Sequence, residues 1–229
     1  MTPDPLPRRL CAEALGTAFL LATVIGSGVM GERLAGGNGA LALLGNTLST
    51  GAILAVLILI FGPVSGAHFN PAVTIAVALR GGFAWSEVAA YIVAQVAGAI
   101  VGVLAAHAMF DLPILQVSTH VRAGLSQGLA EVVATFGLLL TIFGCAARAP
   151  AAVPYAVGLY ITAAYWFTAS TSFANPAVTL ARALSDTFAG IAPAGVPAFI
   201  LAQLIGALLA VAVARQLWPI IAVKHGAPA

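Results

Sequence analysis

Charged side chains are scarce in this sequence. Only 7% of its 229 residues are Asp, Glu, Lys or Arg, whereas 61% are hydrophobic. A soluble domain would carry about a quarter charged residues. The net charge is only +2 and there is no cluster of basic residues, so nucleic acid is not expected as a partner. The composition predicts an integral membrane protein whose surroundings are a lipid bilayer.

The residue patterns of enzymes are missing as well. The two cysteines, Cys11 and Cys145, are too few for a disulfide framework. There is no cluster of metal ligands, no nucleophile–His–acid constellation and no phosphate-binding loop. We therefore expect no enzymatic activity, no catalytic residue, no metal site and no cofactor.

Long apolar runs dominate what remains. A membrane-spanning helix needs about 20 apolar residues. Six segments qualify, and they predict an all-α membrane protein in which residues 1–229 form a single channel domain. The six predicted spans are approximately Leu10–Met30, Leu41–Phe61, Ser86–Ala108, Leu125–Ala146, Val153–Ser170 and Val196–Trp218.

Two further apolar runs, Asn70–Leu79 and Asn175–Leu184, are too short to cross. Ten helical residues cover about 15 Å, half of a roughly 30 Å hydrocarbon core. Both runs begin with Asn-Pro-Ala, and both follow a polar, helix-poor approach. Asn is a favourable N-cap and Pro fits the first helical position. Each run therefore predicts a re-entrant half-helix that starts inside the membrane.

The chain contains a sequence repeat, with a first half at residues 10–108 and a second at 125–218. Glu13 near the start of the first half corresponds to Glu131 in the second. Each half holds three spans, an odd number, so the second half must enter the membrane from the opposite side. This pattern predicts an inverted repeat whose two half-helices meet near the bilayer midplane.

Lys and Arg residues indicate the orientation. With six spans both termini lie on one side, and that side carries six of the nine basic residues. The excess predicts cytoplasmic termini. The six are Arg8, Arg9, Arg80, Arg148, Arg215 and Lys224, and the other side holds Arg33, Arg122 and Arg182.

The positions at which the two half-helices begin suggest a channel through the protein. Irregular backbone at membrane depth is tolerated where it lines a wet cavity. Carbonyl groups of the two approaches would then offer acceptors, and the Asn amides would offer donors. Two helix N-termini aimed at the midplane would repel cations and protons. We expect a channel for neutral solutes, formed around Asn70, Pro71, Ala72, Asn175, Pro176 and Ala177.

The segment Ser-Gly-Ala-His-Phe-Asn-Pro-Ala-Val-Thr at 65–74, the second Asn-Pro-Ala, the paired Glu and the repeated Gln-x-x-Gly-Ala resemble the aquaporin and aquaglyceroporin (major intrinsic protein) family. The resemblance implies six tilted helices, two half-helices, one pore per subunit and a homotetramer. It also implies that Glu13 and Glu131 accept N–H groups from the re-entrant loops. His68 resembles the family's cytoplasmic-side pore histidine, although a loop histidine with satisfied hydrogen bonds is the alternative.

The same resemblance implies four selectivity-filter positions, counted from the two motif Asn residues. They fall on Thr50, Ala163, Ser172 and Val178. Family members usually carry aromatic residues and an arginine there. These four residues are small and neutral, so we expect a wide filter that lacks hydrogen-bond donors and the usual positive charge.

Arg182 lies four residues after Val178, on the same helix face and one turn outward. We hypothesise that it lines the outer vestibule. The alternative is a surface ion pair with Asp186, again four residues away.

A wide neutral filter suits uncharged polyols and metalloid hydroxides. The segment 167–190 is similar to the bacterial branch associated with arsenic-resistance genes, which implies passage of arsenite, alongside glycerol and water, across a bacterial inner membrane. Two alternatives remain. One is a secondary transporter, which is also built from inverted repeats and would couple through Glu13 and Glu131. The other is a water-selective aquaporin.

Overall fold

The computed structural model describes residues 4–219. Lys224, which contributed to the predicted orientation, lies outside these residues. Residues 4–219 form helices and loops without a strand. The first half contains α1 (Leu6–Leu34), α2 (Gly39–Ser65), the short α3 (Pro71–Leu79) and α4 (Trp85–Met109). The second half contains α5 (Leu125–Arg148), α6 (Val153–Phe167), the short α7 (Pro176–Arg182) and α8 (Val196–Leu217), with 3₁₀ turns at Pro150–Ala152 and Pro193–Gly195.

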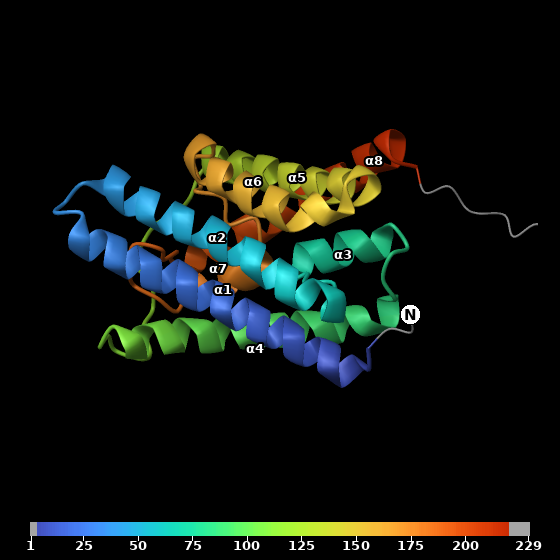
Figure 1. The fold of residues 1–229 in the computed structure, drawn as a ribbon. Coiled ribbons are helices and arrows are strands. Elements are labelled where there is room, and N and C mark those ends of the chain that lie inside the picture. Colours follow the sequence, from blue (N-terminus) through green and yellow to red (C-terminus); the bar gives the residue numbers. More distant parts are fainter. Residues whose placement is uncertain (1–3, 220–229) are drawn as a thin grey trace, which may run out of the picture.

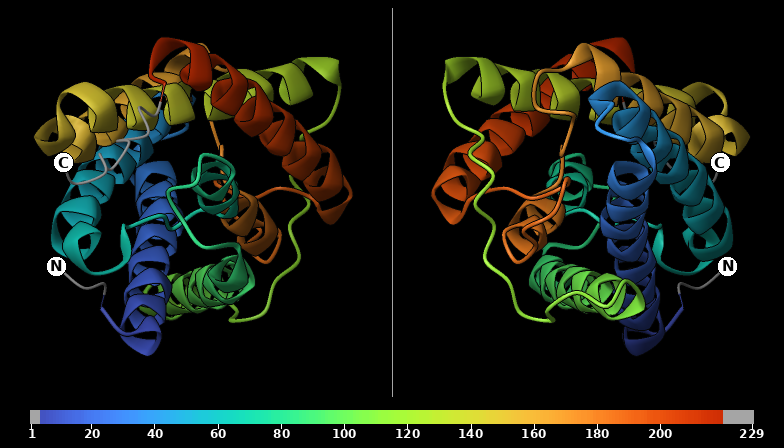
Figure 2. Two further views of the ribbon diagram at one scale, coloured as in Figure 1. Left: turned by 90° about the vertical axis from the view of Figure 1, so that its right-hand side faces the viewer. Right: turned by 90° about the vertical axis from the view of Figure 1, so that its left-hand side faces the viewer.

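The six longer helices surround the two short ones. In the end-on views of Figure 2, α3 and α7 lie in the middle of a ring formed by the other helices. Figure 1 shows that α3 and α7 come from opposite ends of the bundle and meet near its centre. The arrangement is the inverted repeat with two half-helices that the sequence predicts.

Five helices are long and apolar enough to cross a membrane, namely α1, α2, α4, α5 and the segment Pro193–Leu217 that contains α8. The fifth predicted span, Val153–Ser170, is shorter than expected, since α6 ends at Phe167. The turn Pro150–Ala152 leads directly into α6. Together the two cover about 28 Å, close to the thickness of the hydrocarbon core.

The two halves use glycine in the same way to bring helices together. A Cβ atom on Gly98 of α4 would collide with the backbone carbonyl of Ala14 in α1. A Cβ atom on Gly206 of α8 would likewise collide with the Val132 carbonyl in α5. Small residues allow this close approach of helix backbones in membranes. The pairs α1–α4 and α5–α8 are therefore equivalent supports, one on each side of the half-helices.

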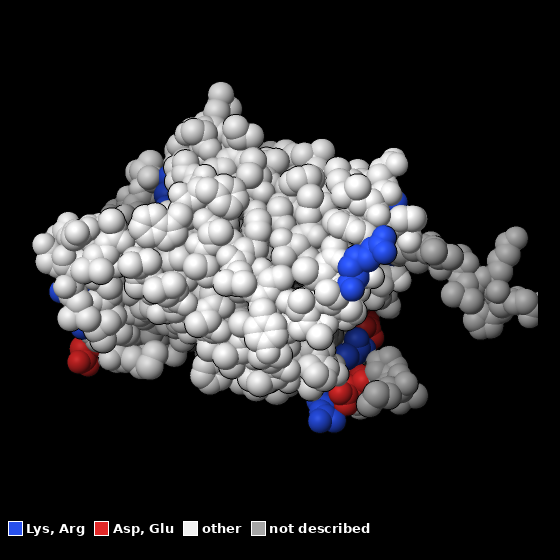
Figure 3. Space-filling view, turned by 45° about the horizontal axis from the view of Figure 1, so that its top comes forward, with Lys and Arg blue, Asp and Glu red and all other residues white. Residues whose placement is uncertain are grey.

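The outer surface suits a bilayer. Large apolar side chains are exposed along the helices, among them Phe19, Val93, Leu159 and Leu201. Figure 3 shows that charged side chains on the displayed face gather at the two ends of the molecule and leave an uncharged band between them. The start of α1 and the end of α8 lie at the same end (Figure 1), as an even number of crossings requires.

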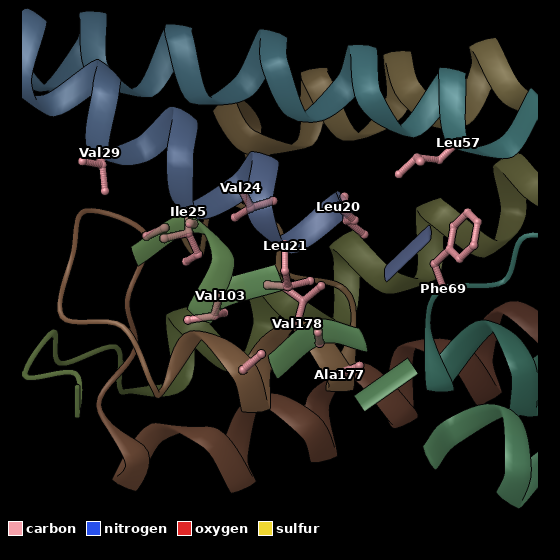
Figure 4. Packing of buried hydrophobic residues seen from close by; sticks show 14 of the residues in the cluster. Leu20, Leu21, Val24, Ile25, Val29, Leu57, Phe69, Val103, Ala177 and Val178 are labelled. Carbon is pink, nitrogen blue, oxygen red and sulfur yellow. The ribbon is translucent and has the colours of Figure 1, made fainter. Parts of the chain in front are cut away.

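The hydrophobic core connects α1 to both re-entrant segments. Leu20, Leu21 and Val24 of α1 share one buried cluster with Phe69, which precedes α3, and Val178 of α7. Figure 4 shows Leu21 beside Val178. This packing fixes the short helices against a long one, so that their N-terminal ends are held at the centre of the bundle.

Candidate channel site

The two half-helices begin as their sequence predicts. Asn70 and Asn175 are extended N-cap residues, and Pro71 and Pro176 occupy the first helical positions. The Asn70 side-chain oxygen accepts the Ala72 N–H at 2.9 Å. The Asn175 oxygen accepts the Ala177 N–H at 3.0 Å, and the Val178 N–H at 3.3 Å. Each cap satisfies N–H groups that a helix start otherwise leaves unpaired.

The amide nitrogens of the same two residues connect the halves. Asn70 Nδ2 donates to the Ala174 carbonyl at 2.7 Å, and Asn175 Nδ2 donates to the Phe69 carbonyl at 2.8 Å. Each carbonyl belongs to the residue just before the other Asn. The motifs are therefore in contact, tip to tip, at the centre of the bundle.

The approaches to both half-helices have an unusual backbone. Ala67, Phe69, Thr171, Ser172 and Ala174 all have φ between 48° and 61°, the left-handed region that residues other than glycine seldom adopt. Such residues cost about 1–3 kcal/mol each and persist where the surroundings impose them, often at functional sites. The backbone near each motif is thus held in a conformation that it would not adopt alone.

Glu13 supplies part of that constraint in the first half. Its carboxylate accepts the backbone N–H groups of His68 at 2.9 Å and Phe69 at 2.7 Å. It also accepts hydrogen bonds from the Ser65 hydroxyl at 2.7 Å and from Gln95 Nε2 at 2.8 Å. The carboxylate is fully buried, and each of its oxygens accepts two donors.

Glu131 repeats this arrangement in the second half. It accepts the N–H groups of Phe173 and Ala174, each at 2.9 Å, and Gln203 Nε2 at 2.6 Å. Both glutamates therefore have the geometry expected of a loop-holding carboxylate. The two glutamines extend the match, because Gln95 also donates to Thr74 of α3 and Gln203 to Thr179 of α7, at 2.9 and 2.8 Å.

A cavity of about 100 Å³ runs beside both motifs. Its lining includes Ile142 near the end of α5 and Val153 at the start of α6, the two Asn residues, Thr50 of α2 and Arg182 at the end of α7. Ala67 and Ala174 also line it. Their side chains have no polar atoms, so any polar surface that they contribute is backbone.

Three of the four predicted filter residues line this cavity, namely Thr50, Ser172 and Val178. The expectation for Ala163 is wrong. Ala163 is exposed on the outside of α6 and is not part of the lining. The face of α6 that lines the cavity carries residues spaced four apart, and Ala163 lies midway between two of them, on the opposite side of the helix. The lining residues of α6 are Val153, Val157, Ile161 and Tyr165.

Tyr165 changes the expected character of the part of the cavity that Thr50 and Arg182 line. Its hydroxyl donates to the Thr50 hydroxyl at 3.3 Å, and the side chain is 3% exposed. An aromatic residue with a polar group therefore lies beside the predicted filter positions. The four-residue spacing of Val157, Ile161 and Tyr165 was the sequence signal that could have identified it.

Arg182 is also part of the lining. It is 2% exposed, its guanidinium lies 3.4 Å from the ring centroid of Phe173, and its Nε donates to the Ala189 carbonyl. The alternative ion pair with Asp186 does not form. Asp186 instead accepts the Thr119 N–H and hydroxyl at 2.7 and 2.9 Å. A guanidinium thus lies in the cavity wall, which agrees with the vestibule hypothesis for Arg182, while the filter position itself is the uncharged Val178.

His68 lines the opposite half of the cavity. Its Nδ1 lies 3.1 Å from the Thr74 hydroxyl, and its ring packs against Phe83 and Tyr91 with centroids 5.1 and 5.5 Å apart. The residue therefore combines the two interpretations, since it borders the cavity and also has a hydrogen-bond partner. Within residues 4–219, no group of three or more His, Cys, Asp or Glu side chains could hold a metal ion.

The fold and the site define a membrane protein with two re-entrant half-helices that meet beside a central cavity. Residues 3–153 match the family model described as Major intrinsic protein. The chain is also 57% identical over 212 residues to the aquaglyceroporin AqpS of Rhizobium meliloti (strain 1021), covering 93% of this chain and 91% of that protein. The chain belongs to the major intrinsic protein family.

Two further comparisons agree. The chain is 33% identical over 151 residues to a glycerol uptake facilitator protein of Streptococcus pneumoniae, covering 58% of this chain and 62% of that protein. Its fold matches the X-ray structure of the aquaglyceroporin from Plasmodium falciparum with a TM-score of 0.72 and 23% sequence identity, over 95% of this chain and 97% of that one.

Proposed function

We propose that this protein is a passive channel for small uncharged solutes, namely glycerol-like polyols, metalloid hydroxides such as arsenite, and water. Two relatives support the solute class through their names, an aquaglyceroporin and a glycerol uptake facilitator. Arsenite follows from the small filter residues, because arsenous acid is uncharged near neutral pH and presents hydroxyl groups as a polyol does.

The observation that carries the proposal is the placement of Asn70 and Asn175 on the wall of the cavity. A primary amide has two N–H donors. Each Asn uses one to hold the opposite loop. The second N–H of each amide is then available to a solute in the cavity that has given up its water.

The hydrogen bonds of the two glutamates weigh against the secondary transporter. Coupling to protons or ions would need an intramembrane acid that is free to change its partners. Glu13 and Glu131 are both fully buried and each accepts at least three donors from loops and neighbouring helices. Protonation of either would disrupt the loop that it holds.

The water-selective alternative differs in the size of the filter. Thr50, Ser172 and Val178 are small, which favours passage of solutes larger than water. We further propose that the channel is a homotetramer in a bacterial inner membrane with cytoplasmic termini. The bacterial source of AqpS and the excess of basic residues at the end that holds the termini support the location and orientation.

Flux through purified protein in liposomes tests the proposal. Vesicles with and without the protein are mixed rapidly with glycerol, arsenite or impermeant sugar, and volume changes are followed by light scattering. A channel gives glycerol and arsenite rates that rise linearly with concentration and do not respond to an imposed proton gradient. Saturation together with dependence on the gradient would favour the transporter, and water flux alone would favour the water-selective channel.

A further inference from the structure

Two arginines lie over one aromatic ring at the outer part of the cavity. The guanidinium of Arg182 is 3.4 Å from the ring centroid of Phe173, and that of Arg122 is 5.1 Å from the same centroid. Arg122 comes from the loop between α4 and α5, whereas Arg182 ends α7. Phe173 itself is 4% exposed and lines the cavity. Residues distant in sequence thus bring two positive charges to one place.

Backbone carbonyls hold both arginines in position. Arg122 donates to the carbonyls of Gly190 and Ser170, at 2.9 and 3.3 Å. Arg182 donates through Nε to Ala189. Neither forms an ion pair with an acid of the described residues, whose ion pairs are Arg8–Asp4 and Arg9–Glu87. The charges are therefore fixed in place and are not neutralised by a carboxylate.

Part of this site is unoccupied by protein. The terminal nitrogens of Arg182 have no acceptor among residues 4–219. Ser172, which is 2% exposed, lines the same cavity and has a buried hydroxyl with no hydrogen-bond partner. The terminal nitrogens of Arg182 therefore remain as hydrogen-bond donors in this wall that a polar solute can use.

We propose that Arg182 is the residue that excludes cations at the outer end of the channel, with Arg122 and Phe173 as positioning residues. The inference rests on the proposed channel function. In this view the positive charge is absent at Val178 but present one helical turn further along α7. The channel then admits larger neutral solutes past Val178 and still repels cations.

The weak screening of charges inside a channel favours such a barrier to cations. Fixed charges act strongly on an ion inside a channel because the surrounding protein and lipid screen poorly compared with water. A guanidinium that forms part of the cavity wall acts on every cation that passes it. A neutral solute of the same shape experiences no such repulsion and gains hydrogen-bond donors.

Urea and guanidinium are suitable probes, since both are planar and nearly equal in size but only guanidinium is charged. Uptake of each labelled tracer into liposomes is measured for the wild type and for Arg182→Gln. We expect the guanidinium-to-urea uptake ratio to rise on the order of tenfold in Arg182→Gln, while urea uptake persists. Arg182→Lys, which retains the charge, should keep the ratio within about twofold of the wild type.

Arg33→Gln is the matched control. Arg33 also lies over a phenylalanine ring, 5.3 Å from the centroid of Phe110, and also donates to a backbone carbonyl, but it is exposed and outside the cavity lining. Its loss should leave the ratio unchanged. Arg122→Gln, in a half-buried loop residue, should raise the ratio by a smaller factor and remains informative if Arg182→Gln does not fold.

The two proposals fail in different ways. A wild type that passes neither urea nor glycerol would overturn the channel function. A wild type that passes urea, together with Arg182→Gln and Arg122→Gln proteins whose guanidinium-to-urea ratios equal that of the wild type, would overturn only the role of Arg182. Restoration of exclusion by Val178→Arg in the Arg182→Gln background would establish that charge, rather than shape, sets the ratio.

Discussion

Asn70 and Asn175 exchange hydrogen bonds across the centre of the protein, each donating to the carbonyl of the residue that precedes the other, at 2.7 and 2.8 Å. Each Asn also caps its own half-helix. One side chain therefore performs two tasks, since its oxygen serves its own half and its nitrogen serves the opposite half. The equivalence of the two exchanges follows from the inverted repeat.

The first prediction concerns this double role. Asn70→Ala and Asn175→Ala should each destabilise the protein by about 2–4 kcal/mol, of which about 1 kcal/mol is the lost cap and the rest is the unpaired carbonyl. Asn38 is a matched control because it caps α2 in the same way but is exposed and contacts no other half. Asn38→Ala should cost only about 1 kcal/mol. Unfolding in detergent measures all three, and equal losses would contradict the double role.

The second prediction concerns the buried glutamates. In Glu131→Gln an amide NH₂ replaces one acceptor oxygen, so that Phe173 or Ala174 loses its partner. We expect a loss of about 1–3 kcal/mol, and the flux of any correctly folded protein should still not depend on a proton gradient. Glu32→Gln, at an exposed position of α1, should change stability by less than about 0.5 kcal/mol. A stable Glu131→Gln protein that has lost gradient-driven uptake would support the transporter instead.

The third prediction compares a residue that lines the cavity, Val178, with a predicted filter residue that does not, Ala163. Val178→Phe places a large ring in the cavity and should lower glycerol flux on the order of tenfold, a barrier increase of about 1.4 kcal/mol, with a smaller effect on water. Ala163→Phe adds the same ring on the exposed side of α6 and should leave both fluxes nearly unchanged. If Ala163→Phe blocked glycerol as strongly as Val178→Phe, the assignment of cavity-lining faces would be wrong.

The fourth prediction concerns Asp186, whose carboxylate connects two loops outside the spanning helices by accepting both donors of Thr119. These hydrogen bonds lower the pKa of Asp186 below its usual range. A lowered pKa means that the contact stabilises the loops above the ordinary Asp pKa of about 3.9 and is lost as the pH falls through the lower value. The protection factor of the Thr119 amide, its exchange rate compared with the intrinsic rate at the same pH, should therefore fall on acidification. Asp186→Asn, which retains an acceptor, should remove this pH dependence, and identical pH profiles would refute the assignment.

Much of the fold could be predicted from sequence because its causes are local. Apolar runs of a given length specify spanning helices, and Asn-Pro-Ala specifies a helix start wherever it lies. The paired glutamates were predictable for a related reason. A re-entrant loop in a membrane has N–H groups that need acceptors, and Glu13 and Glu131 were the intramembrane acids at matching positions of the two halves.

The site was harder to predict where it depended on the rotation of a helix about its own axis or on contacts with residues distant in sequence. Counting back from Asn175 gave the number of residues to Ala163 but not the direction in which the helix faces there, and two residues of error place a side chain on the opposite face. The surroundings of Arg182 could not be derived from its neighbours in sequence, because Arg122 approaches from a loop some 60 residues earlier.

The reciprocal bonds of Asn70 and Asn175 have a consequence for biogenesis. A nascent chain delivers its first three crossings to the bilayer before residue 175 has been translated. During that time the Asn70 amide and the Phe69 carbonyl lack the hydrogen-bond partners that the second half supplies. The first half is consequently an unfinished assembly until synthesis of the second is nearly complete, and a truncated product that ends after α4 would present open polar backbone to lipid.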